Sequence, residues 1–143
     1  MTAKFQYSQV IDRPIDKVFH FYAHDHVLNH PRWDPDIELW LDSDGPIGVG
    51  TVIRRRNSRS GTPVEGTIEV VEYEPNRAMA TIIHDGPVVM YGWVTFEADS
   101  DSRTTITTKV EIPSMDESMD KSFLLSRMER SGRNMKQLME TET

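Results

Sequence analysis

The sequence predicts an α+β fold in which a seven-stranded, curved antiparallel sheet packs against a long C-terminal helix, with two short helices between the first two strands. Three observations lead to this prediction. Residues 37–112 alternate polar and apolar side chains and are interrupted by turns rich in Gly, Pro, Asn and Asp. A long amphipathic segment follows Pro113. The 143 residues contain no repeat or linker, so we expect one domain over residues 1–143.

The N-terminal segment predicts a strand followed by short helices. Residues 4–11, KFQYSQVI, alternate as a strand does. Proline suits a first helical turn, so a helix should begin near Arg13–Pro14 and end near residues 23–24. Four residues of this helix form one apolar stripe: Ile15, Val18, Phe19 and Tyr22. A turn or a second short helix then covers residues 25–30, and Pro31 should end it.

Six further strands are expected after the short helices. They cover residues 37–42, 51–58, 64–73, 77–84, 88–97 and 103–112. Each connection between them is short and contains turn-forming residues, which indicates successive antiparallel hairpins.

The last segment predicts a long helix over roughly residues 114–140. Ser114 and Glu117 have the spacing of a capping box, which marks a helix start. Six residues share one mainly apolar stripe: Leu124, Met128, Ser131, Met135, Leu138 and Met139. Such a helix is not stable alone in water, so it should lie across the sheet. A curved sheet that holds a helix encloses space between them.

The composition argues against several classes of function. A formal charge of −7 opposes contact with phosphate backbones, so no nucleic-acid partner is expected. The chain has no cysteine, which excludes a disulfide framework and fits a reducing cytoplasm. No apolar run approaches the ~18 residues that a membrane span needs. The N-terminus also lacks the long apolar run that is typical of a secretory signal. We therefore expect a cytoplasmic protein without stable membrane insertion.

Five short motifs, in order and at matching spacing, carry a resemblance to a known superfamily. They are IDRPIDKVFHFY, PRWDP, GVGT, VVEYEP and VTFEADSDSRTTIT. Over about residues 4–139 the chain resembles the START, polyketide-cyclase/dehydrase and pollen-allergen-like (SRPBCC) superfamily. The resemblance implies a helix-grip fold with a mostly apolar cavity between the sheet and the long helix.

The resemblance leaves the function open, because the superfamily hosts carriers, cyclases, aromatases, hydrolases and chaperone regulators on one scaffold. The first hypothesis is a carrier or binding protein for a small hydrophobic or aromatic ligand, which needs only a cavity. The second is a cyclase-, dehydrase- or aromatase-type enzyme, which needs an inward donor–acceptor pair. The third is a protein-interaction domain with a solid interior. No cofactor is expected, and no catalytic residue is assigned.

Histidines are concentrated in residues 20–30, and two of their gaps have the i,i+4 spacing of helical metal ligands. His20 and His24 lie opposite the apolar stripe and should face water. A strong zinc site needs a third protein ligand. Asp25 or His26 could supply it only if the turn folded back, so no metal is expected. His26 and His30 lie nearer the segment that the resemblance makes a lid over the cavity, where they could contact a ligand.

Trp33 and the basic run RRRNSR, residues 54–59, are further candidates. Trp33 should anchor the lid, a role compatible with a place in the cavity wall. Alternation sends Arg54 and Arg56 to one face of their strand and Arg55 to the other, and the sequence does not decide which face is inside. We expect Arg54 and Arg56 to contact the ligand, with Glu65, Glu69 or Asp36 as counter-charge. A solvent-facing basic patch is the alternative.

The strand VVMYGWVTFE, residues 88–97, has two interpretations. The resemblance points four residues inward: Met90, Gly92, Val94 and Phe96. Tyr91 and Trp93 would then be outward aromatics that suggest a homodimer contact. A bulge at Gly92 would instead turn Tyr91 into the cavity as a hydroxyl donor.

His84 and a row of three residues on the long helix complete the predicted site. His84 ends a strand, where a polar residue is usually solvated but could act as a general base near a cavity mouth. Met115, Met119 and Phe123 form a row off the main stripe of the long helix and should line a cavity entrance, with a core position as the alternative. The predicted ligand-binding set is therefore Trp33, Arg54, Arg56, Glu65, His84, Met90, Tyr91, Met119 and Phe123.

Overall fold

The computed structural model describes residues 2–42, 45–115 and 121–143. Its strands form one antiparallel sheet in the order β1-β7-β6-β5-β4-β3-β2. The strands are β1 Ala3–Ile11, β2 Ile37–Leu41, β3 Val52–Asn57, β4 Val64–Glu74, β5 Ala78–Asp85, β6 Val88–Ser100 and β7 Arg103–Ile112. The helices are α1 Ile15–Phe19, the π-helical turn η1 His20–His24, α2 His26–Trp33 and α3 Ser122–Glu142. The predicted α+β fold is confirmed.

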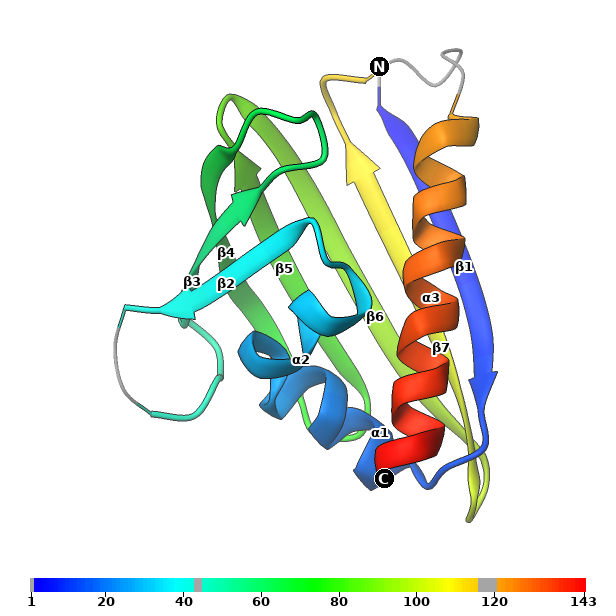
Figure 1. Cartoon of the computed structure of the whole chain (residues 1–143). Helices are drawn as coiled ribbons and strands as arrows, with labels where there is room; N and C mark the ends of the chain where they lie inside the picture. The colour runs from blue at the N-terminus through cyan, green and yellow to red at the C-terminus, as the bar shows by residue number, and fades with distance from the viewer. Residues whose placement is uncertain (1, 43–44, 116–120) are drawn as a thin grey trace.

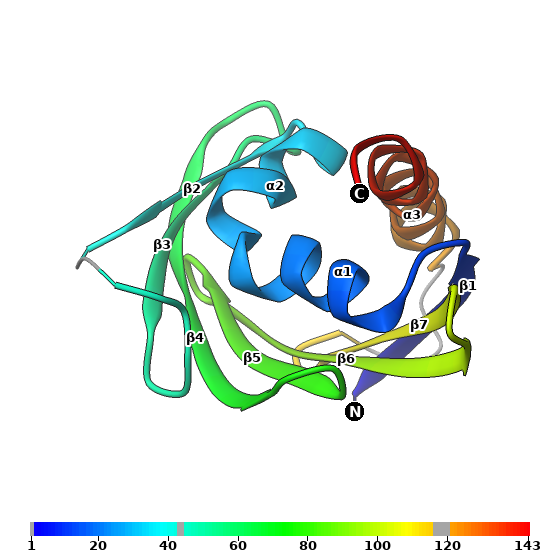
Figure 2. The ribbon, with the colours of Figure 1, turned by 90° about the horizontal axis from the view of Figure 1, so that it is seen from below.

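The sheet curves around its helices. Strands β2 to β7 pair as consecutive hairpins, and the pairing of β1 with β7 completes the sheet. Irregularities between Val70 and Glu72 and between Ala98 and Ser100 interrupt the ladders, and such bulges help strands to bend. Seen from below, the strands form an arc with α1, α2 and α3 on its concave side (Figure 2).

The short helices between β1 and β2 close one end of this arc and form the lid (Figure 1). Val18 and Phe19 of the predicted stripe are buried. Pro31 lies inside α2 and does not end it, so that prediction is wrong. Pro31 has no N–H and therefore removes one backbone hydrogen bond from α2, but the helix continues to Trp33.

Helix α3 begins at Ser122, later than the predicted start at residue 114. Ser114 lies in a turn after β7, in which the Met115 N–H donates to the Ile112 carbonyl at 3.1 Å. Glu117, the other half of the predicted capping box, lies outside the described residues. No helix in the described ranges is long and apolar enough to cross a membrane.

Apolar packing holds α3 against the sheet near both ends of the helix. The larger cluster joins the lid and the sheet to Met135 and Met139 of α3. The smaller cluster contains Phe5 and Ile112, with Leu124 of α3 packed against them. This arrangement leaves space between the sheet and the part of the helix between the two clusters.

Candidate functional site

A cavity of about 210 Å³ lies between the concave face of the sheet and α3. Most of its wall is apolar, and the sheet and α3 supply Phe5, Ile68, Met79, Ile83, Met90, Val94, Val110, Ile112, Leu124, Met128 and Met135. The volume is far above the ~10–15 Å³ that one water needs, and below the ~300–1,000 Å³ of drug-sized sites. It therefore suits a small guest.

Trp33 forms part of the lid side of the cavity wall. Its indole is 4 % exposed, and it stacks on Tyr22 and on His30, with ring centroids 5.4 Å away in each case. Asn134 of α3 donates a hydrogen bond to the Trp33 carbonyl at 3.1 Å. Trp33 therefore anchors the lid to α3 and also faces the cavity.

His26 and His30 form a hydrogen-bonded pair beside Trp33. His26 Nδ1 lies 2.8 Å from the Tyr22 backbone carbonyl, which can only accept, so this nitrogen carries the hydrogen. His26 Nε2 must then accept at 2.9 Å from His30 Nδ1, which donates. His30 is one of the residues that line the cavity, and the Nε2 atom of its neutral ring can only accept a hydrogen bond. One backbone carbonyl thus fixes the tautomers of both neutral rings.

Burial keeps these polar groups uncharged. It lowers the pKa of His26 to about 4, although the hydrogen bond to the Tyr22 carbonyl opposes the shift. The pKa of His30 lies well below its usual value because of burial, and because the charges of Arg55 and Arg59 oppose a positive charge on its ring. Burial also raises the pKa of Tyr22, which lines the cavity too. This side of the cavity therefore offers neutral imidazoles and a neutral phenol.

Arg55 is a deeply buried charge in the cavity wall, with 3 % of its surface exposed. Its guanidinium donates to both oxygens of Asp85, at 2.7 and 3.1 Å, and the Asn57 amide donates to the same carboxylate at 2.9 Å. Burial acts to raise the pKa of Asp85, but these hydrogen bonds and the charge of Arg55 hold it below its usual value. The buried charge is therefore paired, as its burial requires.

Two more arginines in the wall are also matched by aspartates. Arg59 pairs with the buried Asp34, and Arg127 of α3 contacts Asp36 at 2.5 Å. The hydrogen bond from Arg127 lowers the pKa of Asp36. Because Asp34 and Asp36 follow α2, the second pair ties the long helix to the lid. The Nε atoms of both arginines are buried without a hydrogen-bond partner in the described part of the chain.

The structure contradicts the prediction that Arg54 and Arg56 point into the cavity. Arg54 and Arg56 lie on the outer face of β3, where Arg56 pairs with Glu65 at 3.0 Å and all three side chains are well exposed. Ile53 is fully buried and occupies the same face as Arg55. Burial of Ile53 therefore decides which face of β3 points inward, and Arg55 lies on that face.

Strand β6 points Met90, Gly92 and Val94 into the cavity wall. The ladder with β5 is regular at Gly92, so no bulge reverses the strand. Tyr91 consequently lies on the outer face, 44 % exposed, and the alternative of an inward Tyr91 hydroxyl is wrong. Trp93 is also half exposed on that face. The homodimer contact stays a prediction.

Two of the three remaining predicted residues, His84 and Phe123, are absent from the cavity wall. His84 is exposed on the outer face of β5, because Ile83 takes the inner position. Phe123 is 64 % exposed, with the Arg127 guanidinium 4.9 Å from its ring. Met119 lies outside the described residues.

Sequence analysis missed most of the polar wall. Tyr22, Arg59 and Arg127 are not among the predicted ligand-binding residues, and the sequence leaves open whether Arg55 faces inward. One usable signal is that Arg55 lies two residues after Ile53 and therefore on the same face of the strand. A large β-branched residue such as Ile53 favours the buried face. A second was the spacing of His30, four residues after His26 and three before Trp33, which places the three rings on one side of a helix.

The family follows from the sequence match. The sequence model of polyketide cyclase/dehydrase and lipid transport proteins matches residues 2–140. The chain belongs to this family. The family name covers both cyclases or dehydrases and lipid transport proteins, so membership alone does not choose between them. Among curated proteins, none matches the sequence.

Solved structures similar to this family member confirm the helix-grip fold. Ara h 8.0201 is 14% identical with a TM-score of 0.74, over 99% of this chain and 97% of that chain. Major latex-like protein 151 from Panax ginseng is 17% identical with a TM-score of 0.73, over 95% and 96%. A START superfamily protein from Mycobacterium smegmatis is 11% identical with a TM-score of 0.75, over 98% and 99%.

Proposed function

We propose that the protein binds a small amphipathic molecule in the cavity between its sheet and α3. One observation carries the proposal: the cavity has mostly apolar walls, with its histidines and arginines on the side next to the lid. Small-molecule sites have this composition because apolar walls supply burial and a few polar groups fix the orientation. The family name, which includes polyketide and lipid proteins, agrees with a largely apolar guest.

The fixed tautomers define the polar end of the guest. His30 Nε2 can only accept a hydrogen bond, so it would pair with an alcohol, phenol or enol and not with a carboxylate. Arg55 and Arg59 lie near enough to lower the pKa of His30. Their positive charge favours partial negative charge on the guest oxygen and opposes an ammonium group. A phenol or an enolised ketone meets both conditions.

Dye displacement tests the occupancy of the cavity. Ser131 of α3 lines the cavity, so Ser131→Phe places a ring inside it. We expect this variant to bind a polarity-sensitive naphthalene dye at least about tenfold more weakly, a loss of about 1.4 kcal/mol. Ser126→Phe adds the same ring on an exposed part of α3 and should leave dye binding unchanged. Equal binding by both variants, or none by the unaltered protein, contradicts the proposal.

A second variant tests the polar end separately. His30→Phe retains a ring that can stack on Trp33 but has no acceptor nitrogen. A phenol that displaces the dye should bind roughly two- to tenfold more weakly to this variant, the value of one hydrogen bond. The matching benzene derivative without the hydroxyl should bind the variant and the unaltered protein equally. Equal losses for the two compounds would indicate a damaged cavity and no hydrogen bond to His30.

Acid–base catalysis on a carbonyl compound is a second candidate function. The neutral His30 imidazole in the cavity wall, hydrogen-bonded to His26, favours it, because a general base needs a free lone pair beside the substrate. Deuterium uptake by a β-keto thioester in heavy water would be faster with the unaltered protein than with His30→Phe. Equal rates would count against catalysis. The protein-interaction hypothesis has less support, since it expects a solid interior.

A further inference from the structure

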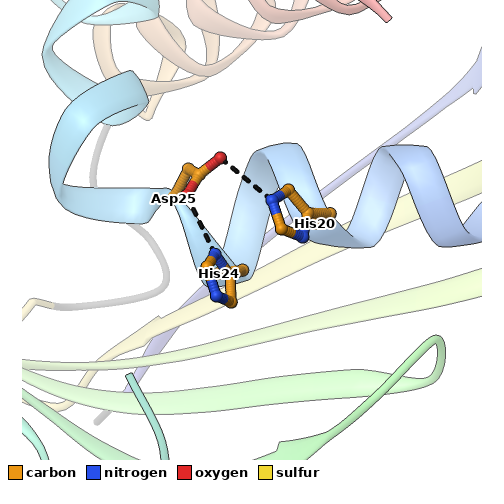
Figure 3. Close-up of side chains that lie close together, drawn as sticks. All are labelled: His20, His24 and Asp25. Atoms are coloured by element: carbon orange, nitrogen blue, oxygen red, sulfur yellow. Dashed lines mark hydrogen bonds and ion pairs between the residues drawn. The ribbon is translucent and has the colours of Figure 1, made fainter. Parts of the chain in front are cut away.

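We propose that His20, His24 and Asp25 bind a divalent metal ion of the zinc type on the outer surface of the lid. Figure 3 shows the Asp25 carboxylate between the two rings. Asp25 Oδ2 lies 3.2 Å from His20 Nε2, and Asp25 Oδ1 lies 2.9 Å from His24 Nδ1. Each residue has one ligand atom within 4.8 Å of the ligand atoms of the other two.

The π-helical turn η1 brings the three side chains together. In a regular α-helix of 3.6 residues per turn, residues five apart point about 140° away from each other, so His20 and Asp25 would diverge. In η1 the Asp25 N–H donates to the His20 carbonyl, five residues earlier, at 3.0 Å. The turn therefore holds one extra residue, and both His24 and Asp25 lie one turn after His20 on the same side. Turns of this kind are frequent at functional sites.

The Asp25 side chain gives a second, independent indication. Asp25 is the N-cap residue of α2, yet its side chain makes no capping hydrogen bond. An aspartate at this position usually accepts a hydrogen bond from a backbone N–H of the first turn and so stabilises the helix. Here both carboxylate oxygens face imidazole nitrogens instead. The local structure thus favours the cluster with the histidines over the ordinary stabilisation of the helix.

The ligand set matches the chemistry of zinc. Two imidazole nitrogens and one carboxylate oxygen, with further positions for water, are ligands that Zn²⁺ accepts at about 2.0–2.2 Å. The His20 and His24 rings are stacked, with centroids 4.2 Å apart and planes at 15°. Their exposed fractions of 59 % and 47 % allow an ion to enter from solvent and each ring to change its tautomer. The site lies outside the cavity wall and is independent of the guest.

Binding should stiffen the lid. The ligands lie in η1 and at the residue that joins it to α2, so an ion would hold the two short helices in one arrangement. An ion that binds only the folded state raises the thermal unfolding temperature as its concentration increases.

Calorimetric titration of the full chain, without any affinity tag, with zinc chloride tests the site. We expect one ion per chain with a dissociation constant in the micromolar range. His24→Gln and Asp25→Asn should each weaken binding at least about tenfold. His84→Gln is the matched control, because it removes an exposed histidine from β5, and it should leave the affinity unchanged. Circular dichroism shows whether each variant folds.

Histidine ring nitrogen shifts in NMR spectra provide a second measurement. Zinc should shift the signals of His20 and His24 and leave that of His84 unchanged. No binding by the unaltered protein, or equal binding by all three variants, would overturn the proposal. Shifts confined to histidines other than His20 and His24 would overturn it as well.

Discussion

Removal of the Asp85 carboxylate should destabilise the protein much more than removal of an exposed carboxylate. Arg55 is 3 % exposed and donates two hydrogen bonds to Asp85, and Asn57 donates a third. In Asp85→Ala the guanidinium stays buried without its counter-charge. Breaking one side of a buried ion pair lowers the free energy of unfolding by about 3–5 kcal/mol. We expect about 3 kcal/mol, the lower end of that range, because Arg55 lines a cavity that water can enter.

An exposed ion pair that includes Arg54, the neighbour of Arg55 on β3, supplies the control. Arg54 contacts Asp42 at 2.6 Å, and the two side chains are 56 % and 50 % exposed. Asp42→Ala should change the free energy of unfolding by at most about 1 kcal/mol. Urea unfolding followed by circular dichroism gives both values, and an unchanged m-value shows that the same states are compared. Losses of equal size in Asp85→Ala and Asp42→Ala would show that Arg55 is not a desolvated charge.

The same pair has a defined pH dependence. The pKa of Asp85 is depressed in the folded state relative to about 3.9 in an unfolded chain. Its contribution to stability is therefore fully present above the unfolded value and is lost as the pH falls through the folded value. Asp85→Ala should lose less stability than the unaltered protein on acidification below about pH 4. Arg55→Met combined with Asp85→Leu should recover most of the lost stability, because the double variant leaves neither charge of this pair buried without its partner.

Two further substitutions test the placement of α3. Gly132→Ala should lower the free energy of unfolding by about 1 kcal/mol. The added Cβ would lie 2.5 Å from Tyr7 Cε2. Such overpacking costs about 1–3 kcal/mol, which exceeds the gain of about 1 kcal/mol from the higher helix propensity of alanine. A more stable variant in urea unfolding would mean that the helix can move away from β1. Arg127→Ala removes the shorter of two contacts of α3 with Asp36 and leaves Arg130 at 3.7 Å from that carboxylate. Hydrogen exchange of α3 amides should therefore become faster, while global stability changes by about 1 kcal/mol or less. Unchanged exchange would show that this pair does not hold the helix.

The order of strands and helices could be predicted because its signals are local. Alternation with period two and turn residues mark each hairpin within a few positions, and the structure keeps all of these strands. The start of α3 could not be located in the same way. Ser114 has a capping pattern, but the backbone after Ile112 forms a turn, so the local signal was overridden by the connection between β7 and α3.

The inner face of β3 depends on a residue far along the chain. Ile53 and Arg55 share one face, whereas Arg54 and Arg56 share the other, and each pattern mixes charge with apolar residues. Asp85, thirty positions away from Arg55, provides the counter-charge that makes an inward arginine stable. This partner reaches Arg55 only after β3, β4 and β5 have paired, so no local pattern could reveal it.

The geometry of the lid also depends on an unusual backbone. Helical periodicity places His20 and His24 together but sends Asp25 elsewhere, and only the π-helical turn brings Asp25 to them. From the sequence, Asp25 or His26 can supply a third ligand only if the turn folds back, and in the structure the π-helical turn η1 places Asp25 beside both histidines. A single extra residue in one turn is not visible in the pattern of side chains.

Methyl NMR spectra of the methionines test the binding of a guest most directly. Met90, Met128 and Met135 line the cavity, whereas Met139 is buried outside its wall. Titration with a phenol that displaces the dye should shift the methyl signals of the first three and give contacts from the phenol to them, while Met139 stays unchanged. A guest that leaves the signals of Met90, Met128 and Met135 in place would show that nothing binds between the sheet and α3.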